Sequence, residues 1–257
     1  MKLRPLMAGQ SSVENLFEKY IIEECTSFDE LLKLYNSFRE SNRGKSVILS
    51  LDDLNQAEYT STHATLTYDL DNTEGYDLSG VDAVAFEEGE HIGYLSTPSE
   101  FFIRKENFIK QAGGVDFSEV GERGLTIEGK EIQLLEKINE FPLQYLDKQL
   151  MLCIIPVEKA YEAICGFPNG YFSSDLNPFE NYALAKHLQE RYGYELFGIG
   201  ASLLGFIREG RLEDQQAREL IADLIEVYNS KDDISEKMKG IITDKNYFFI
   251  KYTESLQ

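Results

Sequence analysis

Between Lys45 and Arg104 the chain contains no lysine and no arginine, and this gap constrains its fold more than any other feature of the sequence. Residues 51–100 hold twelve carboxylates and no basic side chain, so they supply twelve of the twenty net negative charges. Like charges held in one folded segment repel one another. We therefore expect this segment to form either a solvated acidic face or a docking surface for a cationic partner.

The overall charge argues against two large classes of partner. A protein that binds nucleic-acid backbones needs a cationic surface to displace counterions, whereas this chain has 25 Lys and Arg against 45 Asp and Glu. The same imbalance argues against an anionic membrane surface, and no stretch reaches the roughly 20 apolar residues of a membrane span. Three widely spaced cysteines without a CxxC motif indicate no disulfide framework, so the cytoplasm is the expected location.

Apolar periodicity predicts a mixed chain of the α+β or α/β class. In the first half it predicts a helix over 13–24, a second helix that begins with a capping box at Ser27, and a half-buried strand over 62–70. Two short strands and one more helix follow, at 82–86, 92–95 and 98–111. The elements predicted in the second half are strand 125–127, helix 129–140, strand 150–155, helix 157–164, helix 178–192, strands 195–199 and 203–207, helix 213–229 and strand 247–250.

A change of composition suggests where the chain divides. Residues 112–124 are rich in glycine and poor in periodicity, which is typical of a linker. We expect an acidic N-terminal α+β domain over 1–111 and a C-terminal α/β domain over 125–257, each built as helix and sheet layers. The C-terminal domain is expected to contain a small sheet flanked by helices.

No cofactor or metal motif is complete, so we expect neither a cofactor nor a metal. The glycines at 198, 200 and 205 lack the lysine of a phosphate-binding loop, because Phe206 and Ile207 stand where lysine and Ser or Thr are required. The acidic run 69–75 lacks the glycine and the final carboxylate of an EF-hand, which leaves only an irregular calcium loop open. Glu88 and His91 have helical ligand spacing, but they lie on a predicted turn.

The loop over 166–178 is the strongest local candidate for a small-molecule pocket. It is rich in aromatic residues, glycine and proline, and it lies between a cysteine and a histidine that would form a nucleophile and base pair only within hydrogen-bond reach. A buried structural cysteine is the common alternative. The residues of this alternative pocket are Cys165, Asn169, Tyr171, Asp175 and His187.

An ordered series of motifs over residues 150–253 resembles the bacterial domain-of-unknown-function family 4253. Family members typically close with a tryptophan-rich strand, whereas this chain has no tryptophan and closes with aromatic residues at 247–249. The resemblance implies a bacterial cytoplasmic protein, and it supplies no activity and no catalytic residues. The motifs that carry it are Ile155-Pro156-Val157, the loop 166–170, Asp175-Leu176-Asn177-Pro178, Arg191-Tyr192-Gly193, the strand 195–199 and the helix with Ala217, Glu219 and Leu220.

These observations favour a non-catalytic protein-binding module that captures a cationic protein through an acidic surface, as immunity proteins and inhibitors of basic toxins do. An enzyme with a site at 165–187 and a nucleic-acid mimic are the alternatives, and the oligomeric state stays open. The residues assigned to the partner-binding face are Asp52, Asp53, Asp69, Asp71, Glu74 and Asp77.

Overall fold

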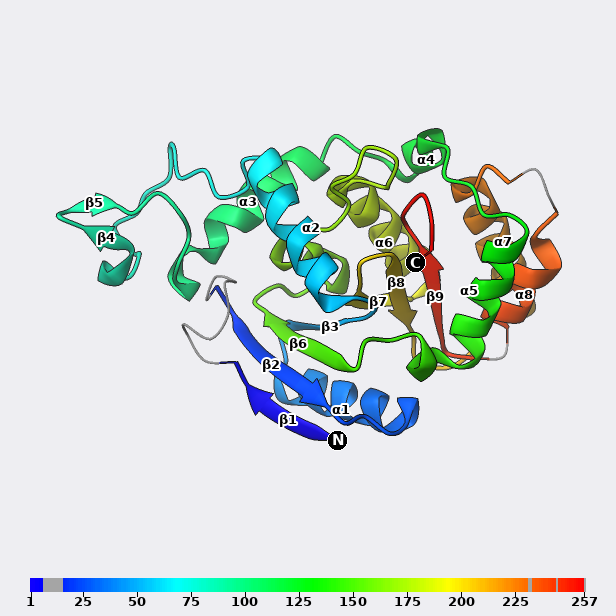
Figure 1. Ribbon diagram of the computed structural model, residues 1–257. Helices are drawn as coiled ribbons and strands as arrows, with labels where there is room; N and C mark the ends of the chain where they lie inside the picture. Colours follow the sequence, from blue (N-terminus) through cyan, green and yellow to red (C-terminus); the bar gives the residue numbers. More distant parts are fainter. Residues whose placement is uncertain (7–15, 231–232, 244, 257) are drawn as a thin grey trace.

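A mixed sheet of seven strands lies at the centre of the computed structural model, which describes residues 1–6, 16–230, 233–243 and 245–256 (Figure 1). The strand order is β1-β2-β6-β3-β7-β8-β9. Within it β3 and β7 run parallel, and every other neighbouring pair is antiparallel. The strands are β1 Lys2–Pro5, β2 Glu18–Glu23, β3 Ser46–Ser50, β6 Gln149–Ile155, β7 Glu195–Ile199, β8 Leu203–Ile207 and β9 Tyr247–Lys251, and a separate pair contains β4 Phe86–Glu87 and β5 Glu90–His91.

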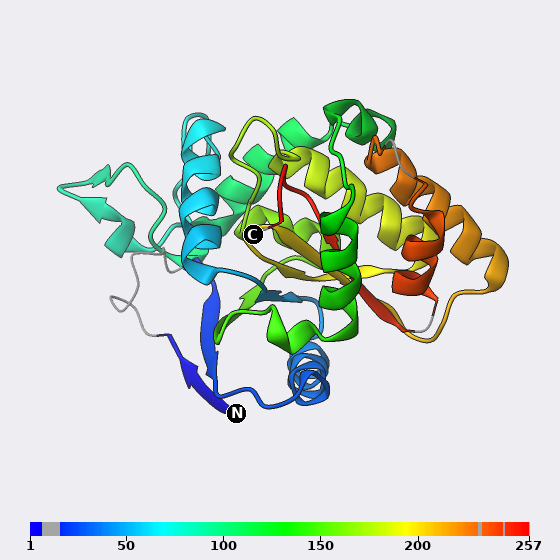
Figure 2. The same ribbon diagram turned by 45° about the vertical axis from the view of Figure 1, so that its right-hand side comes forward.

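Helices cover both faces of this sheet, with α1 below it and α2, α3 and α6 above it in both views (Figures 1 and 2). On the lower face, the Tyr35 ring of α1 lies 5.7 Å from the Phe197 ring of β7. The α-helices are α1 Phe28–Ser41, α2 Leu54–Thr67, α3 Phe101–Ala112, α4 Phe117–Val120, α5 Lys130–Glu140, α6 Pro178–Tyr192, α7 Asp214–Val227 and α8 Ser235–Ile242. The 3-10 turns are η1 Ala83–Ala85, η2 Pro98–Glu100, η3 Gly121–Arg123, η4 Pro142–Gln144 and η5 Ala160–Gly166.

The mixed α and β class is confirmed, and several elements begin and end where their local signals predict. Ser27 caps α1 by accepting a hydrogen bond from the Glu30 N–H at 3.1 Å. Asn177 caps α6 in the same way, and Gly193 ends that helix in the left-handed conformation with φ 72°. The predicted strands at 195–199 and 203–207 coincide with β7 and β8.

Five predicted elements are wrong. Of the predicted strands 82–86 and 92–95, only Phe86 lies in a strand, because the hairpin strands are β4 Phe86–Glu87 and β5 Glu90–His91. The part of the predicted helix 13–24 that the structure describes contains strand β2, and Val13 lies outside the described residues. The predicted strand 62–70 lies mostly within helix α2. Residues 125–127 form no strand, although Leu125 and Ile127 are buried as that prediction required.

The sheet takes strands from both sides of the predicted linker at 112–124. β3, from the first predicted domain, lies between β6 and β7 of the second. The predicted linker contains α4 and η3, and Gly121 packs so closely that a Cβ there would lie 2.8 Å from the Glu226 carbonyl oxygen. The sheet itself is therefore not divided at 112–124, and the carboxyl ends of β3 and β7 lie together at its centre.

Candidate functional site

A short hairpin projects from one end of the molecule, away from the central sheet (Figures 1 and 2). It consists of β4 and β5, which pair antiparallel across a tight turn. The turn residues Glu88 and Gly89 both have positive φ, at 52° and 88°. We call residues 82–94, which contain this hairpin, the acidic arm.

The acidic arm presents carboxylates and apolar side chains together. Two large apolar residues are strongly exposed, Val84 at 76% and Tyr94 at 59%. Four acidic residues of the arm are exposed as well. These acidic residues are Asp82, Glu87, Glu88 and Glu90.

A buried carboxylate anchors the base of the arm. The His91 Nε2 atom lies 2.6 Å from Glu100 Oε1, and Glu100 Oε2 accepts the backbone N–H groups of Ser96 and Thr97 at 2.9 and 2.8 Å. Burial alone would raise the pKa of Glu100, but these hydrogen bonds outweigh it and hold the pKa below its ordinary value. Glu100 therefore holds the arm in place and does not face solvent.

Four of the six carboxylates assigned to the partner-binding face are exposed in the structure: Asp53, Asp69, Glu74 and Asp77. Asp53 also begins α2, because its side chain accepts the Gln56 N–H at 3.1 Å. The backbone N–H of residue 79 donates to Asp77 Oδ1, which lowers the pKa of Asp77. Along the sequence, these four carboxylates and those of the arm belong to residues 51–100, which we call the acidic segment.

The other two assigned carboxylates hold the fold together. Asp52 accepts three hydrogen bonds, from the Ser202 N–H (2.8 Å), the Ser202 hydroxyl (2.5 Å) and the Leu203 N–H (3.2 Å), and burial raises its pKa. Asp71 accepts two hydrogen bonds from the Arg104 guanidinium, at 2.6 and 2.5 Å. Arg104 is only 4% exposed. Neither carboxylate is free to meet a partner.

A hollow of about 380 Å³ lies beyond the carboxyl ends of the parallel strands β3 and β7. We call it the edge hollow. Its lining comes from four separate parts of the chain, namely Gln56 of α2, the loop 172–175, residues 201–202 after β7, and residues 253–255. Ligands of α/β sheets commonly bind at this edge, where successive connections diverge. The C-terminal segment is tied to the loop by a 2.8 Å hydrogen bond from the Leu176 N–H to the Tyr252 carbonyl.

The alternative pocket does not form as one site. Asp175 lines the edge hollow, whereas His187 lines a different depression beside Phe117, on which its ring stacks at 3.7 Å. Cys165 is fully buried, and burial raises the pKa of its thiol, so it is not poised as a nucleophile. His187 pairs instead with Asp223, at 2.6 Å between Nε2 and Oδ2.

The remaining two residues of that prediction have different roles. Asn169 is buried and receives a hydrogen bond from the Thr60 hydroxyl, while its carbonyl accepts from the Asn181 side chain at 3.0 Å. Tyr171 is 36% exposed, and its ring lies 5.0 Å from the His63 ring of α2. Loop 166–178 is therefore bound to α2 at the buried Asn169 and is exposed at Tyr171.

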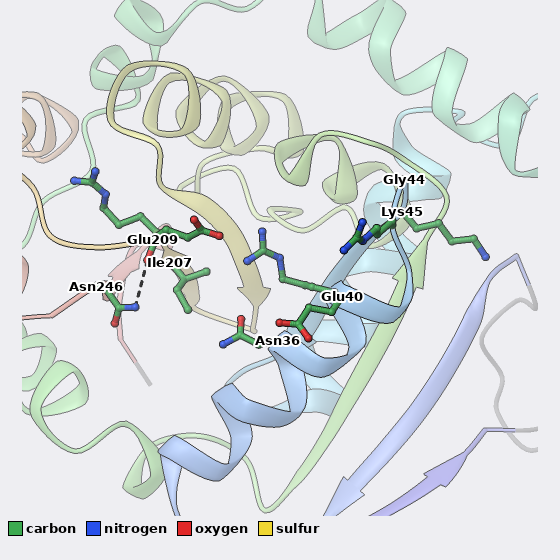
Figure 3. Close-up of a pocket in the computed structure, with 10 residues that line it drawn as sticks. Asn36, Glu40, Gly44, Lys45, Ile207, Glu209 and Asn246 are labelled. Atoms are coloured by element: carbon green, nitrogen blue, oxygen red, sulfur yellow. Dashed lines mark hydrogen bonds between the residues drawn. The ribbon is translucent and has the colours of Figure 1, made fainter.

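A second depression, of about 520 Å³, lies at the opposite edge of the sheet (Figure 3). The sequence did not predict this depression, because its basic residues come from two separate places, the end of α1 and the end of β8. These residues are Arg39, Arg43, Lys45 and Arg208. Glu40 and Glu209 stand among them, and Figure 3 shows Lys45 directed away from Glu209. Arg39 is paired with Glu195. Lys45 Nζ lies 3.7 Å from Glu18 Oε1, and the buried Nε and Nη1 atoms of Arg208 have no hydrogen-bond partner among the described residues.

In the described ranges, no helix is both long and apolar enough to cross a membrane, and no cluster of three or more His, Cys, Asp or Glu is arranged to hold a metal ion. Comparison of the chain with protein-family models, with curated proteins and with solved structures found no match in any of the three.

Proposed function

We propose that this protein is a binding module that captures a cationic protein partner through its acidic segment, with the acidic arm at the centre of the contact. The observation that carries the proposal is the arm itself, a projecting hairpin that has exposed carboxylates together with the exposed Val84 and Tyr94. Large apolar side chains that are exposed beside charged residues indicate an interaction surface rather than a merely solvated face.

The two kinds of side chain have different tasks in this proposal. Exposed carboxylates attract a cationic surface and orient it during approach, so they mainly raise the association rate. Burial of apolar area supplies the lasting affinity, and full burial of a valine side chain contributes about 1.5–3 kcal/mol. Tyrosine is among the residues that most often dominate binding energy at interfaces. Tyr94 is therefore the proposed anchor.

The proposal extends to the setting of the protein. The cysteines of the described chain are all free thiols, which supports a reducing compartment such as the cytoplasm. An inhibitor or immunity protein for a basic toxin is the kind of role that such a surface supports, and the resemblance to the bacterial family 4253 supports only a bacterial origin. The acidic segment and the arm carry this argument, and the resemblance adds no residue to it.

The test is capture of a partner by the purified protein from lysate of its own organism at low and high salt, with matched variants. One variant carries Glu87→Gln, Glu88→Gln and Glu90→Gln on the arm. The control removes three exposed carboxylates elsewhere, by the changes Glu140→Gln, Glu209→Gln and Glu226→Gln.

The proposal expects a cationic protein that is retained in stoichiometric amount at low salt, is released by salt, and is lost with the arm variant but not with the control. Tyr94→Ala should speed dissociation of the captured protein in surface plasmon resonance and leave its association rate nearly unchanged. Equal retention by the arm variant and the control would overturn the proposal, as would the retention of no cationic protein.

A further inference from the structure

A row of exposed aromatic rings leads to the edge hollow. The Tyr59 and His63 rings of α2 lie 4.2 Å apart, His63 and Tyr171 lie 5.0 Å apart, and Tyr171 and Phe172 lie 5.5 Å apart. Tyr59 is 51% exposed and Phe172 is 47% exposed. We call these four residues the aromatic row. The neighbouring rings are tilted against one another, and aromatic side chains exposed at a surface form a face against which a ligand can lie.

The aromatic row and the edge hollow are continuous, because Phe172 belongs to both. The hollow has the volume of a small-ligand site. The described residues that line it include Asp175 and Glu254, and no lysine, arginine or histidine is among them. Phosphates and carboxylates therefore meet only like charge there.

The Asp175 carboxylate is positioned by the fold and lacks a cation in the hollow. Its residue is 6% exposed, and its Oδ1 atom accepts the Glu254 N–H at 2.9 Å. Burial raises the pKa of Asp175, the neighbouring Glu254 raises it further, and Lys251 and Arg123 act in the opposite direction.

Both of these nearby cations are engaged with other groups. Lys251 Nζ lies 2.8 Å from Glu131 Oε2 and 2.8 Å from the carbonyl oxygen of residue 254. Arg123 donates to Glu180 at 2.6 Å and to the carbonyl of residue 173 at 3.1 Å. A cation that entered the hollow would meet a carboxylate that its neighbours have not neutralised by direct contact.

The geometry points to a binding site for an organic cation, in which a primary ammonium or guanidinium group lies against Asp175 and Glu254 and its carbon chain lies along the aromatic row. Aromatic faces attract such cations, and the hydroxyl groups that line the hollow can accept the remaining N–H bonds. The site is independent of the acidic arm. The same chemistry occurs in free diamines and polyamines and in the side chains of lysine and arginine.

The experiment titrates the full-length protein with 1,4-diaminobutane and with agmatine, followed by calorimetry and by tyrosine fluorescence, which is informative because the chain has no tryptophan. The neutral analogue 1,4-butanediol is the matched control probe. Nα-acetyl-lysine amide and Nα-acetyl-arginine amide, which keep the charged side chain, represent the lysine and arginine side chains of a peptide. Saturable binding of at least one amine or guanidine is expected, with affinity at least tenfold above that of the diol. Stronger binding of the free amines assigns the site to a small molecule, and stronger binding of the amides assigns it to a peptide side chain.

Three variants separate this site from general attraction to an acidic protein. Phe172→Ala and Asp175→Asn should each weaken binding at least tenfold. Phe141→Ala, which removes an aromatic ring 48% exposed elsewhere, should leave binding unchanged. The arm variant with Gln at 87, 88 and 90 should also bind normally, because it removes its three charges from a different surface, whereas Asp175→Asn removes one charge from the site itself.

Circular dichroism establishes that each variant is folded, and Phe172→Ala keeps the test decisive if Asp175→Asn is unstable. Equal binding of the diol and the amine would overturn the proposal. So would wild-type affinity in Phe172→Ala, or a loss of affinity in the arm variant equal to that in Asp175→Asn. The absence of saturable binding of all four cationic probes would overturn it as well.

Discussion

Replacing Asp71 by asparagine tests whether this carboxylate serves stability or partner binding. The Arg104 side chain that it contacts is 5% exposed and the Asp71 side chain 18%, so the pair is largely removed from water. Removal of one partner of a buried ion pair typically costs about 3–5 kcal/mol. Asparagine keeps one acceptor and Asp71 is partly solvated, so we expect about 3 kcal/mol, the lower end of that range.

Urea unfolding followed by circular dichroism measures this loss. With a slope of about 3 kcal/mol per molar urea, the midpoint should fall by about 1 M. Asp69→Asn, an exposed change of the same charge on the neighbouring turn, should alter stability by less than about 0.5 kcal/mol and weaken capture of the partner at low salt. Equal midpoints for Asp71→Asn and Asp69→Asn would refute the reasoning that Asp71 holds the segment to α3.

Gly200→Ala should destabilise the protein by about 3 kcal/mol, because the new Cβ would lie 1.8 Å from Asp52 Oδ1, while Gly240→Ala, with open space around it, should be harmless in the same urea assay. In the native protein a thiol reagent should modify Cys25 alone, because the other two cysteines are buried, whereas in denaturant it should modify all three. Rapid modification of three thiols in the native protein would contradict this packing. The lowered pKa of Glu100 means that its contribution to stability is present above about pH 4.3 and is lost as pH falls through the lowered value. Glu100→Gln should therefore flatten the dependence of the midpoint on pH between about 5 and 3, and an unchanged slope would refute that assignment.

Elements with complete local signals were predictable from the sequence. Helix α6 has a cap at Asn177, a proline at its first position and a left-handed glycine at its end, and these signals agree with its burial pattern. Strands β7 and β8 follow it as short apolar runs with every interior residue buried. Local and tertiary preferences coincide here, so no further information was needed.

Helix α2 was missed because its buried face is partly polar. Thr60 and Thr65 are 3% and 5% exposed, and the Thr65 hydroxyl donates to the carbonyl of residue 61 in the preceding helical turn. Because the sequence pattern assigns threonine to solvent, it predicted an alternating strand where the helix buries threonine. Strand β2 failed for the opposite reason, since pairing with β6 overrides the helical spacing of its apolar residues.

The candidate sites were only partly predictable. Aromatic residues near 171 and the acidic excess of residues 51–100 are visible in the sequence, and both reach the surface. The partner of Asp71 is Arg104 of α3, and the lining residue Glu254 comes from the far end of the chain. No spacing rule connects such positions, because only the completed sheet brings them together.

The position of β3 between β6 and β7 has a consequence for synthesis of the chain on the ribosome. β6 follows β3 by about 100 residues and β7 follows it by about 150, which translation at 5–20 residues per second delivers roughly 5–30 s later. Until then the nascent chain presents β3 with both edges unpaired, and unpaired edges recruit other chains. Carboxylates from the acidic segment follow β3 directly, so their mutual repulsion keeps neighbouring nascent chains apart while the strand waits for its partners.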